Sequence, residues 1–496
     1  MTQEKAAEAL ERFEKRLHAW NTALDAINYD GETAAPARSV EDRGNVVEVI
    51  SGEIHRMMTA PETAEMLEAL SGSEDRVIRR RAEVLKEDAG DLLTIPGEEY
   101  AAWMRLTSEA WTAWHDAKEK DDFSLFRPWL EQIVETRRRF AGYRDSSRPA
   151  YEVTLDSFEK GMTIEKLDDF FDLLKKELTP VILAQSEKPL PDFAFLRGSF
   201  PAWRQKRLAE RIMQVMGIDR ERCCLGETEH PFTGGSSRSC VRITTNYDEG
   251  NVLSSLYSVI HEGGHALYEL GTAPELEGTC LGSGSSMAVH ESQSRFYENL
   301  IGRSRPFCEA LLPLLREEFP EQFAGVTGEQ LYQAVNVARP SLIRTEADEL
   351  TYPMHILVRY ELEKALMSRS LTVKELPEAW REMYGRYLGI RPETDRDGVL
   401  QDVHWSCGDL GYFPSYALGS AYGAQMLPRL EQDVPGVWQQ VAAAELSGVT
   451  GWLGEKIHRY GRLLTPVQLQ ENACGGPFDP SFYVDYLKKK YGEMPC

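Results

Sequence analysis

The sequence contains no long hydrophobic run. No stretch approaches the roughly 18 consecutive apolar residues that a membrane-spanning helix needs. The chain opens with Met1-Thr-Gln-Glu-Lys and continues in a charged, amphipathic pattern that lacks the apolar core of a signal peptide. We therefore expect a cytoplasmic protein that does not bind a membrane.

Positive charge is scarce. Lysine and arginine together number 56, against 79 aspartates and glutamates, which leaves a net charge of −23 at pH 7. A protein needs a basic face to bind the phosphates of a nucleic acid, and an anionic membrane surface likewise attracts basic segments. The charge balance argues against both kinds of partner.

Cysteine is sparse and unpatterned. The eight cysteines are scattered over 496 residues without a C-x-x-C pair. A chain of this length can bury a core that needs no disulfide. We expect reduced thiols, including the adjacent Cys223 and Cys224, for which a vicinal disulfide is the alternative.

Strand-like alternation is rare, whereas apolar residues at helical spacings of three and four recur along residues 1 to about 190 and again after 425. Thr163 suits a helix N-cap, and Pro180 is expected to end the helix that Thr163 begins. Pro128 suits a helix start. A further helix over 201–216 is expected to end at Gly217.

One segment reads differently. Residues 223–246 are rich in loop-forming residues, and within them Cys240-Val-Arg-Ile-Thr-Thr245 has the β-branched composition of a strand. The edge of such a ribbon could pair with an extended peptide, or the ribbon could be only structural. No composition shift marks a domain boundary, so residues 1–496 are predicted to form a single unit.

The most informative stretch is a predicted helix over 251–270 that contains His261-Glu262-Gly-Gly-His265. Residues four apart lie one above the other on a helix, so the two histidines can direct their imidazoles at one point. Two such histidines are half of a catalytic zinc site. Glu262 lies about 100° round the helix from His261, where it can act as a general base on water.

Two glycines interrupt this helix. Gly263 and Gly264 each cost about 1 kcal/mol relative to alanine in a helix interior. We expect substrate or the neighbouring ribbon to pass close over them, and a tightly packed neighbour is the alternative. Gly271 is expected to follow the last helical residue as a C′ glycine.

A third ligand must come from a glutamate after His265. Glu269 lies on the same helix and would crowd three ligands on one stripe. Glu291 follows serines that can cap a second helix, and a carboxylate from a packed second helix completes a two-histidine site with one position open. We choose Glu291, and we expect the neighbouring His290 to support a ligand rather than to bind metal or substrate. The other glutamates considered are Glu275, Glu277 and Glu298.

Further motifs accompany this helix: His290-Glu-Ser-Gln-Ser294, Ile343-Arg344-Thr-Glu-Ala-Asp348 and Gly398-Val-Leu-Gln401-Asp402-Val-His404-Trp405. In order and spacing, and over nearly the whole chain, these motifs resemble those of the carboxypeptidase Taq family of metallocarboxypeptidases. One motif departs. Where the family has D-x-R-x-T, this chain has Cys240-Val-Arg242-Ile-Thr244, so a carboxylate that could pair with Arg242 is missing.

The resemblance implies a mainly α fold, similar to that of neurolysin and angiotensin-converting enzyme. In that fold two helical halves enclose a deep groove, and a small β-ribbon lies beside the active site. The resemblance also implies a homodimer that binds zinc, or cobalt, and removes single residues from the free C-terminus of peptides. It implies broad specificity, with C-terminal proline resisted.

Arg344 is the candidate for binding the terminal carboxylate of the peptide. Its guanidinium fork matches a carboxylate in a bidentate, charge-assisted pair. A structural ion pair with Glu346 or Asp348 is the alternative, and the resemblance favours the substrate.

The oxyanion of the tetrahedral intermediate needs a donor. Related helical metallopeptidases use a tyrosine shortly after a substrate-binding histidine, which implies His404 and Tyr416, with Tyr412 as the second choice. Packing with a satisfied hydroxyl is the alternative for each tyrosine. Gln401 and Arg242, from the family motifs, complete the expected substrate-binding set.

Two other functions fit the same residues. The first is an endopeptidase, oligopeptidase or dipeptidyl carboxypeptidase on the same scaffold. The second is a helical binding protein with a vestigial metal site, against which the intact Glu262 argues, because a binding module needs no general base.

Overall fold

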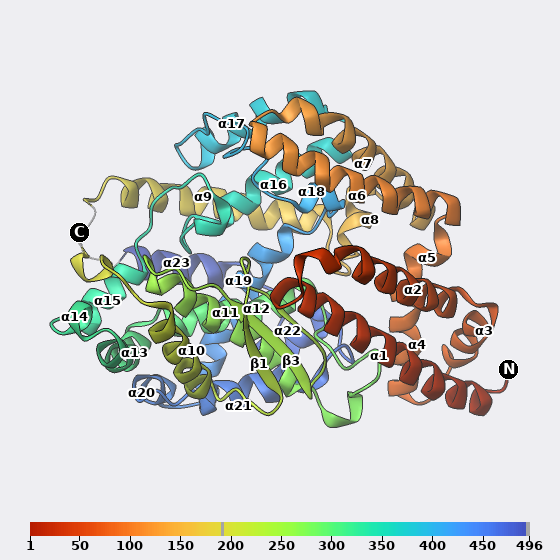
Figure 1. The fold of residues 1–496 in the computed structure, drawn as a ribbon, viewed down its shortest axis with the longest axis horizontal. Coiled ribbons are helices and arrows are strands. Elements are labelled where there is room, and N and C mark those ends of the chain that lie inside the picture. Colours follow the sequence, from red (N-terminus) through yellow and green to blue (C-terminus); the bar gives the residue numbers. More distant parts are fainter. Residues whose placement is uncertain (190–192, 493–496) are drawn as a thin grey trace.

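Helices make up nearly all the regular structure of residues 1–189 and 193–492, which a computed structural model describes (Figure 1). The chain up to residue 271 contains α1 (Gln3–Thr33), α2 (Val40–Thr59), α3 (Pro61–Leu70), α4 (Arg76–Asp88), α5 (Gly90–Thr94), α6 (Gly97–Lys120), α7 (Phe123–Arg144), α8 (Ala150–Leu155), α9 (Ile164–Ser186), α10 (Ala202–Met216) and α11 (Val252–Gly271). The chain after residue 271 contains α12 (Met287–Arg295), α13 (Arg305–Glu318), α14 (Pro320–Phe323), α15 (Gly328–Val335), α16 (Tyr352–Met367), α17 (Leu376–Tyr387), α18 (His404–Cys407), α19 (Pro414–Asp433), α20 (Val437–Ala442), α21 (Ser447–Lys456), α22 (Pro466–Cys474) and α23 (Ser481–Gly492). Three other helical segments contain residues discussed below. The π-helix η4 (Phe296–Gly302) contains Glu298, and the 3-10 turns η5 (Arg344–Glu346) and η7 (His458–Tyr460) contain Arg344 and His458.

The predicted caps are confirmed where the sequence offered a good capping residue. Thr163 accepts a hydrogen bond from the backbone N–H of Lys166 at the start of α9. Ser286 does the same for α12 by accepting from Val289. Gly217 follows α10 in the left-handed conformation, with φ of 75°. Local chemistry is enough to set these helix ends.

Both proline predictions are wrong. α7 begins at Phe123, where Asp122 caps it, and runs through Pro128. α9 runs through Pro180 to Ser186. A proline removes one backbone hydrogen bond inside a helix, which costs about 3 kcal/mol. The buried stripe of α9 continues past the proline to Ile182, and its packing on α23 offsets that cost.

A three-stranded sheet has the order β1-β3-β2. β3 (Cys240–Thr245) has the predicted bounds and lies between β1 (Cys223–Glu227), which is parallel to it, and β2 (Thr233–Ser237), which is antiparallel. β1 and β2 fall in the segment predicted as loops, because pairing with β3 rather than composition makes them strands. The sheet packs on α11 through β3.

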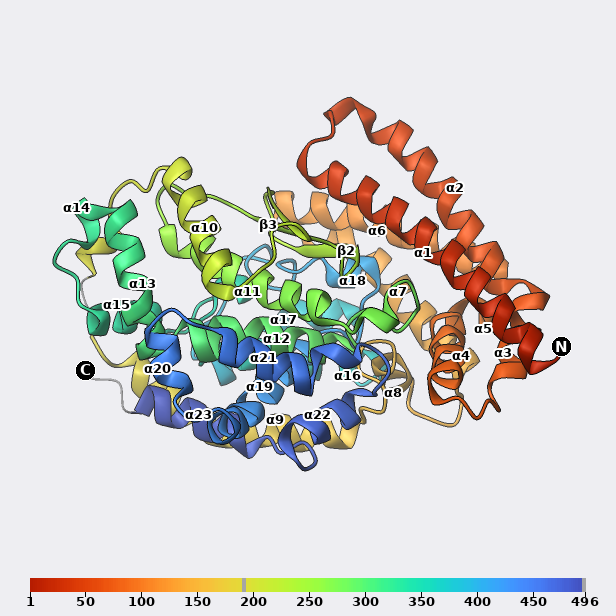
Figure 2. The same ribbon diagram turned by 90° about the horizontal axis from the view of Figure 1, so that it is seen from below.

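The helices gather in groups around α11 and α12. In Figure 1, α6, α7, α16 and α17 form the upper part, and α10 to α13 with α19 to α22 form the lower part. Figure 2 shows α1 and α2 side by side, projecting at the amino-terminal end. One large core joins the upper and lower parts, and a small separate core lies between α1, α3 and α4. None of the helices in residues 1–189 and 193–492 has both the length and the apolar character that crossing a membrane would require.

The cysteines of the described residues are free thiols, including the adjacent Cys223 and Cys224. This confirms the predicted reduced state for those positions. Cys496 lies outside the described residues.

The two glycines of the histidine helix face other helices, not substrate or the ribbon, so that prediction is wrong and the packing alternative is correct. A Cβ on Gly264 would lie 2.7 Å from both the carbonyl oxygen of Gln293 and the Cα of Ser294 in α12. A Cβ on Gly263 would lie 2.7 Å from the methyl group of Met216 in α10. Gly264 therefore lets the backbones of α11 and α12 approach within contact distance.

The predicted role of Gly271 is also wrong. It is the last residue inside α11, and Thr272 is the C-cap. A Cβ on Gly271 would lie 2.7 Å from the Cβ of His458, so close packing requires the glycine. His458 is itself buried and bonded to Gln293, as expected for a core histidine.

We predict that Gly264→Ala lowers the free energy of unfolding by about 1–3 kcal/mol, because the added methyl group overpacks the contact between α11 and α12. Chemical denaturation measures this change. Gly451→Ala in α21 is the matched control, since a Cβ there would meet no atom within 4 Å. The control should gain about 0.5–1 kcal/mol from its higher helix propensity. Equal stabilities for the two variants would contradict the packing role of Gly264.

Candidate metal centre

Three possible metal ligands converge at the contact between α11 and α12. The ligand atoms of His261, His265 and Glu291 all lie within 4.8 Å of one another. Glu291 Oε2 lies 3.5 Å from Nε2 of His265 and 3.8 Å from Nε2 of His261. The structure thus brings together the two histidines and the glutamate chosen as the third ligand.

The other glutamates lie behind or away from this cluster. Glu298 bonds to Nδ1 of His261, and Glu269 bonds to Nε2 of His290. Glu277 accepts a hydrogen bond from Ser239, and Glu275 is exposed. A second close group of potential ligands, His115, Asp116 and Glu119, is fully exposed on α6 and has no comparable support.

Hydrogen bonds behind the histidines leave both Nε2 atoms able to coordinate. Nδ1 of His261 lies 2.8 Å from Glu298 Oε2, so this nitrogen carries the proton and Nε2 keeps its lone pair. Nδ1 of His265 lies 2.6 Å from Nδ1 of His290, and Nε2 of His290 lies 2.7 Å from Glu269 Oε1. Because Glu269 accepts the proton of His290 Nε2, Nδ1 of His290 accepts the proton of His265 Nδ1. His265 is therefore held in the same tautomer as His261. Burial lowers the pKa of His265 to about 3, so it stays neutral.

Two imidazole nitrogens and one carboxylate oxygen, supported in this way, fit a divalent transition metal. His290 contacts the candidate ligand His265 and does not belong to the cluster itself.

Two arginines balance the charge of the centre, and the sequence reasoning missed them. Nε of Arg295 donates to Glu291 Oε1 at 2.7 Å, and its Nη1 donates to Glu298 Oε2 at 3.1 Å. Arg303 donates to Glu298 Oε1 at 3.0 Å. Burial opposes ionisation of Glu291, but Arg295 and the two histidines outweigh it and hold the pKa of Glu291 below its usual range. The spacing of four between Glu291 and Arg295 was the available signal.

Glu262 lies beside the ligands on α11. It is 7% exposed, and its Oε2 accepts a hydrogen bond of 2.6 Å from the hydroxyl of Thr233 on β2. Burial raises the pKa of Glu262, which suits a group that must accept and return a proton near neutral pH. The small sheet thereby orients this carboxylate.

Arg344 lies in a second buried charge cluster. Its Nε donates to Asp402 Oδ1 at 2.9 Å, and its Nη1 donates to the hydroxyl of Tyr352 at 3.1 Å. Arg359 donates to the other oxygen of Asp402 at 2.6 Å. The structural ion pair is therefore with Asp402, not with Glu346 or Asp348. Over residues 1–189 and 193–492, Nη2 of Arg344 makes no hydrogen bond, so part of the fork is left for another anion.

His404, Tyr412 and Tyr416 lie together between this cluster and the metal ligands. Nε2 of His404 is 3.2 Å from the hydroxyl of Tyr416, and the rings of Tyr412 and Tyr416 are 5.0 Å apart. Burial raises the pKa of Tyr412 to about 12, and the nearby charge of Glu291 adds to the shift. Burial also raises the pKa of Tyr416 well above its usual value. Both hydroxyls therefore stay protonated and can donate.

Gln401 and Arg242 have different surroundings. The amide oxygen of Gln401 accepts from the backbone N–H of Arg344 at 3.0 Å and from Arg359 at 2.7 Å. Its amide nitrogen donates to the backbone carbonyls of Leu342 and Asp397. Gln401 thus ties loops together around Arg344. Arg242 lies over the ring of Tyr29 on α1, 4.8 Å from its centroid, which links the sheet to the amino-terminal helix.

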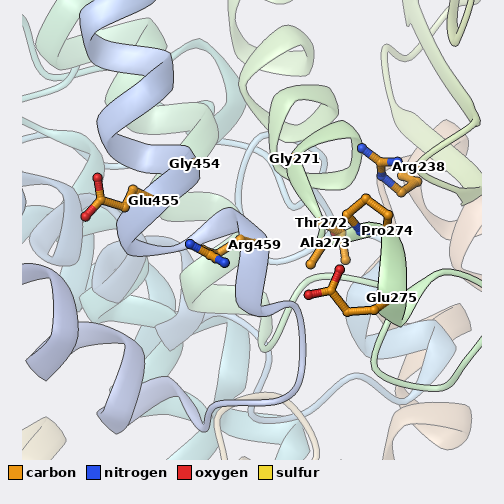
Figure 3. Close-up of a pocket in the computed structure, with 9 residues that line it drawn as sticks. All are labelled: Arg238, Gly271, Thr272, Ala273, Pro274, Glu275, Gly454, Glu455 and Arg459. Atoms are coloured by element: carbon orange, nitrogen blue, oxygen red, sulfur yellow. The ribbon is translucent and has the colours of Figure 1, made fainter.

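A cavity of about 330 Å³ lies at the C-terminal end of α11, and residues other than the candidate ligands line it (Figure 3). Its lining includes Arg238, Glu275 and Arg459 and none of the metal ligands. The candidate metal centre is therefore not this cavity.

Comparison with known proteins gives consistent matches over nearly the whole chain. The family model described as carboxypeptidase Taq (M32) metallopeptidase matches residues 9–491. Carboxypeptidase 1 of Bacillus subtilis is 39% identical over 486 residues, which cover 97% of each chain. The crystal structure of an M32 carboxypeptidase from Deinococcus radiodurans is 36% identical, covers 99% of both chains and has a TM-score of 0.95. A structure of Pyrococcus furiosus carboxypeptidase described as Apo-Mg is 34% identical, covers 98% of this chain and 99% of its own, and also has a TM-score of 0.95.

We predict that Glu291→Gln leaves the purified protein with little bound metal, because a neutral amide is a poor substitute for a carboxylate ligand. Glu298→Gln keeps all three candidate ligands but replaces the charged acceptor behind His261 with a neutral amide, and should weaken metal binding by about 10- to 100-fold. Elemental analysis after dialysis against a metal buffer measures both effects. Glu275→Gln, at an exposed position, should retain the metal content of the unaltered protein. Full metal occupancy in Glu291→Gln would rule out this ligand set.

Proposed function

The chain belongs to the carboxypeptidase Taq (M32) family of metallopeptidases and is a metallocarboxypeptidase, and from this premise we propose how its residues release single amino acids from the free C-terminus of peptides. The fold agrees with that of the family, since a mainly helical chain with one small sheet matches solved M32 structures. The proposal concerns the identity of the metal, the role of each residue and the choice of bond.

The proposed metal is zinc, with cobalt as a substitute. The support is the donor set of two imidazole nitrogens and one carboxylate oxygen, from His261, His265 and Glu291, which suits a borderline-soft divalent ion. When bound, such an ion supplies a Lewis acid that polarises a carbonyl and lowers the pKa of water.

Glu262 is proposed as the general base and acid. It accepts a proton from the attacking water and delivers it to the leaving amine. Its support is its position beside the two histidines, its burial, and the bond from Thr233 that directs the carboxylate.

Tyr416 is proposed to donate a hydrogen bond to the oxyanion, and His404 to orient the Tyr416 hydroxyl or to share this task. The 3.2 Å contact between the two side chains supports this. Tyr412 is the second candidate donor, because its hydroxyl is close enough to Glu291 for the carboxylate charge to raise its pKa.

Arg344 is proposed to bind the terminal carboxylate, and the observation that carries the proposal is its position. The guanidinium lies 5.0 Å from the ring centroid of Tyr416, and Tyr416 in turn feels the charge of Glu291. Arg344 and the candidate ligand Glu291 both lie near Tyr416, so a peptide whose terminal carboxylate pairs with Arg344 would place its last peptide bond near His261, His265 and Glu291. Gln401 would act by holding the backbone of Arg344.

Several properties rest on the family resemblance. We include in the proposal a single catalytic unit over residues 1–496 with a groove between two helical halves, a homodimer, and broad specificity with C-terminal proline resisted. Arg242 would contact substrate from the sheet, although Cys240 removes the carboxylate that the family motif places beside it. Peptides with a free C-terminus are the proposed partners, and nucleic acids and membranes are not.

We predict that Glu262→Gln lowers kcat by about 100- to 10,000-fold, because the amide cannot accept the proton of water. Release of the C-terminal amino acid measures the rate, and metal content should stay unchanged. Thr233→Val, which removes the hydrogen bonds of the hydroxyl to the carboxylate and to the backbone carbonyl of Glu262, should lower kcat by a smaller factor. Near-normal turnover in Glu262→Gln would refute its role as the base.

We predict that Arg344→Met raises KM for peptides with a free C-terminus by about 30-fold or more. The same variant should lose the preference for free over amidated termini, which a matched pair of peptides would show. Arg359→Met is the control, since Arg359 also pairs with Asp402 but is fully buried. It should lower stability while keeping the preference. If the unaltered enzyme hydrolysed both peptides equally well, the assignment of Arg344 would be wrong.

A further inference from the structure

One buried glutamate holds two points of the segment that carries the oxyanion candidates. We call residues 404–416 the tyrosine strap, because they contain His404, Tyr412 and Tyr416. Glu363 on α16 is 0% exposed. Its Oε1 accepts from the indole N–H of Trp405 at 2.8 Å, next to His404. Its Oε2 accepts from the backbone N–H of Gly411 at 2.9 Å, next to Tyr412.

A third donor completes the arrangement. The hydroxyl of Tyr151 on α8 donates to Glu363 Oε2 at 2.8 Å. Glu363 has no lysine, arginine or histidine partner within ion-pair distance in the described part of the chain. A buried carboxylate without such a partner is costly, and here only its three hydrogen bonds compensate.

The site requires an acceptor oxygen at both positions of the residue 363 head group. Trp405 Nε1 and the Gly411 N–H can only donate, so both oxygens of residue 363 must accept. Glutamine has the same shape, but its NH₂ group would face one of these donors and leave it unpaired, which costs more than the missing bond alone. Glutamate is therefore the side chain that bonds the strap at two points at once.

Two glycines turn the backbone of the tyrosine strap close to these anchor points. Gly408 and Gly411 have φ of 82° and 95°, a conformation that glycine adopts without strain and that turns the backbone sharply. Arg137 also donates to the carbonyl of Gly408, at 2.7 Å. These turns lie between His404 and Tyr416 and bring the Tyr416 hydroxyl to 3.2 Å from Nε2 of His404.

We propose that Glu363 is a positioning residue for peptide hydrolysis, which anchors the tyrosine strap at Trp405 and Gly411 so that the tyrosine hydroxyls stand where the oxyanion forms. This rests on the proposed function of Tyr416. Glu363 itself touches neither the metal ligands nor Arg344; it acts through the strap. Burial raises the pKa of Glu363 and its three hydrogen bonds lower it, and the net result is a pKa of about 7.

Glu363→Gln tests the anchor. A displacement of about 1 Å at a catalytic group can lower a rate roughly 100-fold, so kcat should fall by about 10- to 100-fold while KM and metal content stay unchanged. Hydrogen exchange followed by mass spectrometry should show faster exchange in peptides that cover residues 404–416. Glu361→Gln is the matched control on α16, because Glu361 also accepts from a tyrosine, Tyr387, and pairs with Lys175. It lacks contacts with the strap and should change neither measurement.

A double-mutant cycle separates anchoring from general destabilisation. In a Tyr416→Phe background, Glu363→Gln should lower kcat by clearly less than in the unaltered enzyme, because the group it positions is already gone. An undiminished effect in that background would overturn the proposal, and so would unchanged exchange over 404–416 or unchanged kcat in the single variant.

Two further outcomes are covered. If Glu363→Gln does not fold, Trp405→Phe removes one donor and leaves the carboxylate; a smaller loss of kcat is expected, and an unaltered kcat overturns the proposal. If Tyr416→Phe alone leaves kcat unchanged, the proposed role of Tyr416 fails. The exchange measurement then still decides whether Glu363 holds the strap, so the two failures are distinguishable.

Discussion

The close approach of α11 and α12 is the constraint on which the centre depends. Two histidines on one helix can meet a glutamate on another only if the two backbones nearly touch, and the missing side chain of Gly264 makes that possible. α19 also approaches Glu291 so closely that it needs a glycine at the contact. A Cβ on Gly419 would lie 2.7 Å from the Cβ of Glu291, so α19 packs directly against the ligand. Three helices thus confine one carboxylate, and its position follows from backbone packing rather than from side-chain flexibility.

Burying so many charges is possible because each cluster pairs charges of opposite sign. At the metal centre, Glu291 and Glu298 face Arg295 and Arg303. At the second cluster, Arg344 and Arg359 share Asp402. That second cluster has two cations and one anion, so it retains an excess of positive charge. Such an excess suits a site whose proposed ligand is the carboxylate of a peptide, which would supply the second anion.

The tyrosine strap connects the two clusters. Tyr416 contacts Arg344, burial and the charge of Glu291 raise the pKa of Tyr416, and the backbone N–H of Gly411 bonds to Glu363 on α16. His404 is the first residue of α18 and Tyr416 lies in the first turn of α19, while Tyr412 lies in the connection between these two helices. The bonds from Trp405 and Gly411 to Glu363 tie α18 and this connection to α16.

Local patterns in the sequence determined much of this protein. The spacing of His261 and His265, the flanking Glu262, and the caps at Thr163 and Ser286 depend on residues within one or two helical turns, so they can be read without a fold. Glu291 was chosen because capping serines predict a second helix that carries it, and the guanidinium fork made Arg344 a candidate for binding a carboxylate. The family motifs then favoured both assignments. The strand at Cys240–Thr245 was likewise evident from composition.

Other features were decided only by tertiary structure, because they join residues that are distant in the chain. The partner of Arg344 is Asp402, 58 positions away, and no local pattern indicates it. β1 and β2 are strands because β3 lies between them. α9 continues through Pro180 because its apolar stripe packs on α23. Gly264 faces α12 rather than substrate. In each case the energy of a long-range contact outweighs or selects among local preferences, and that energy exists only after the chain has folded.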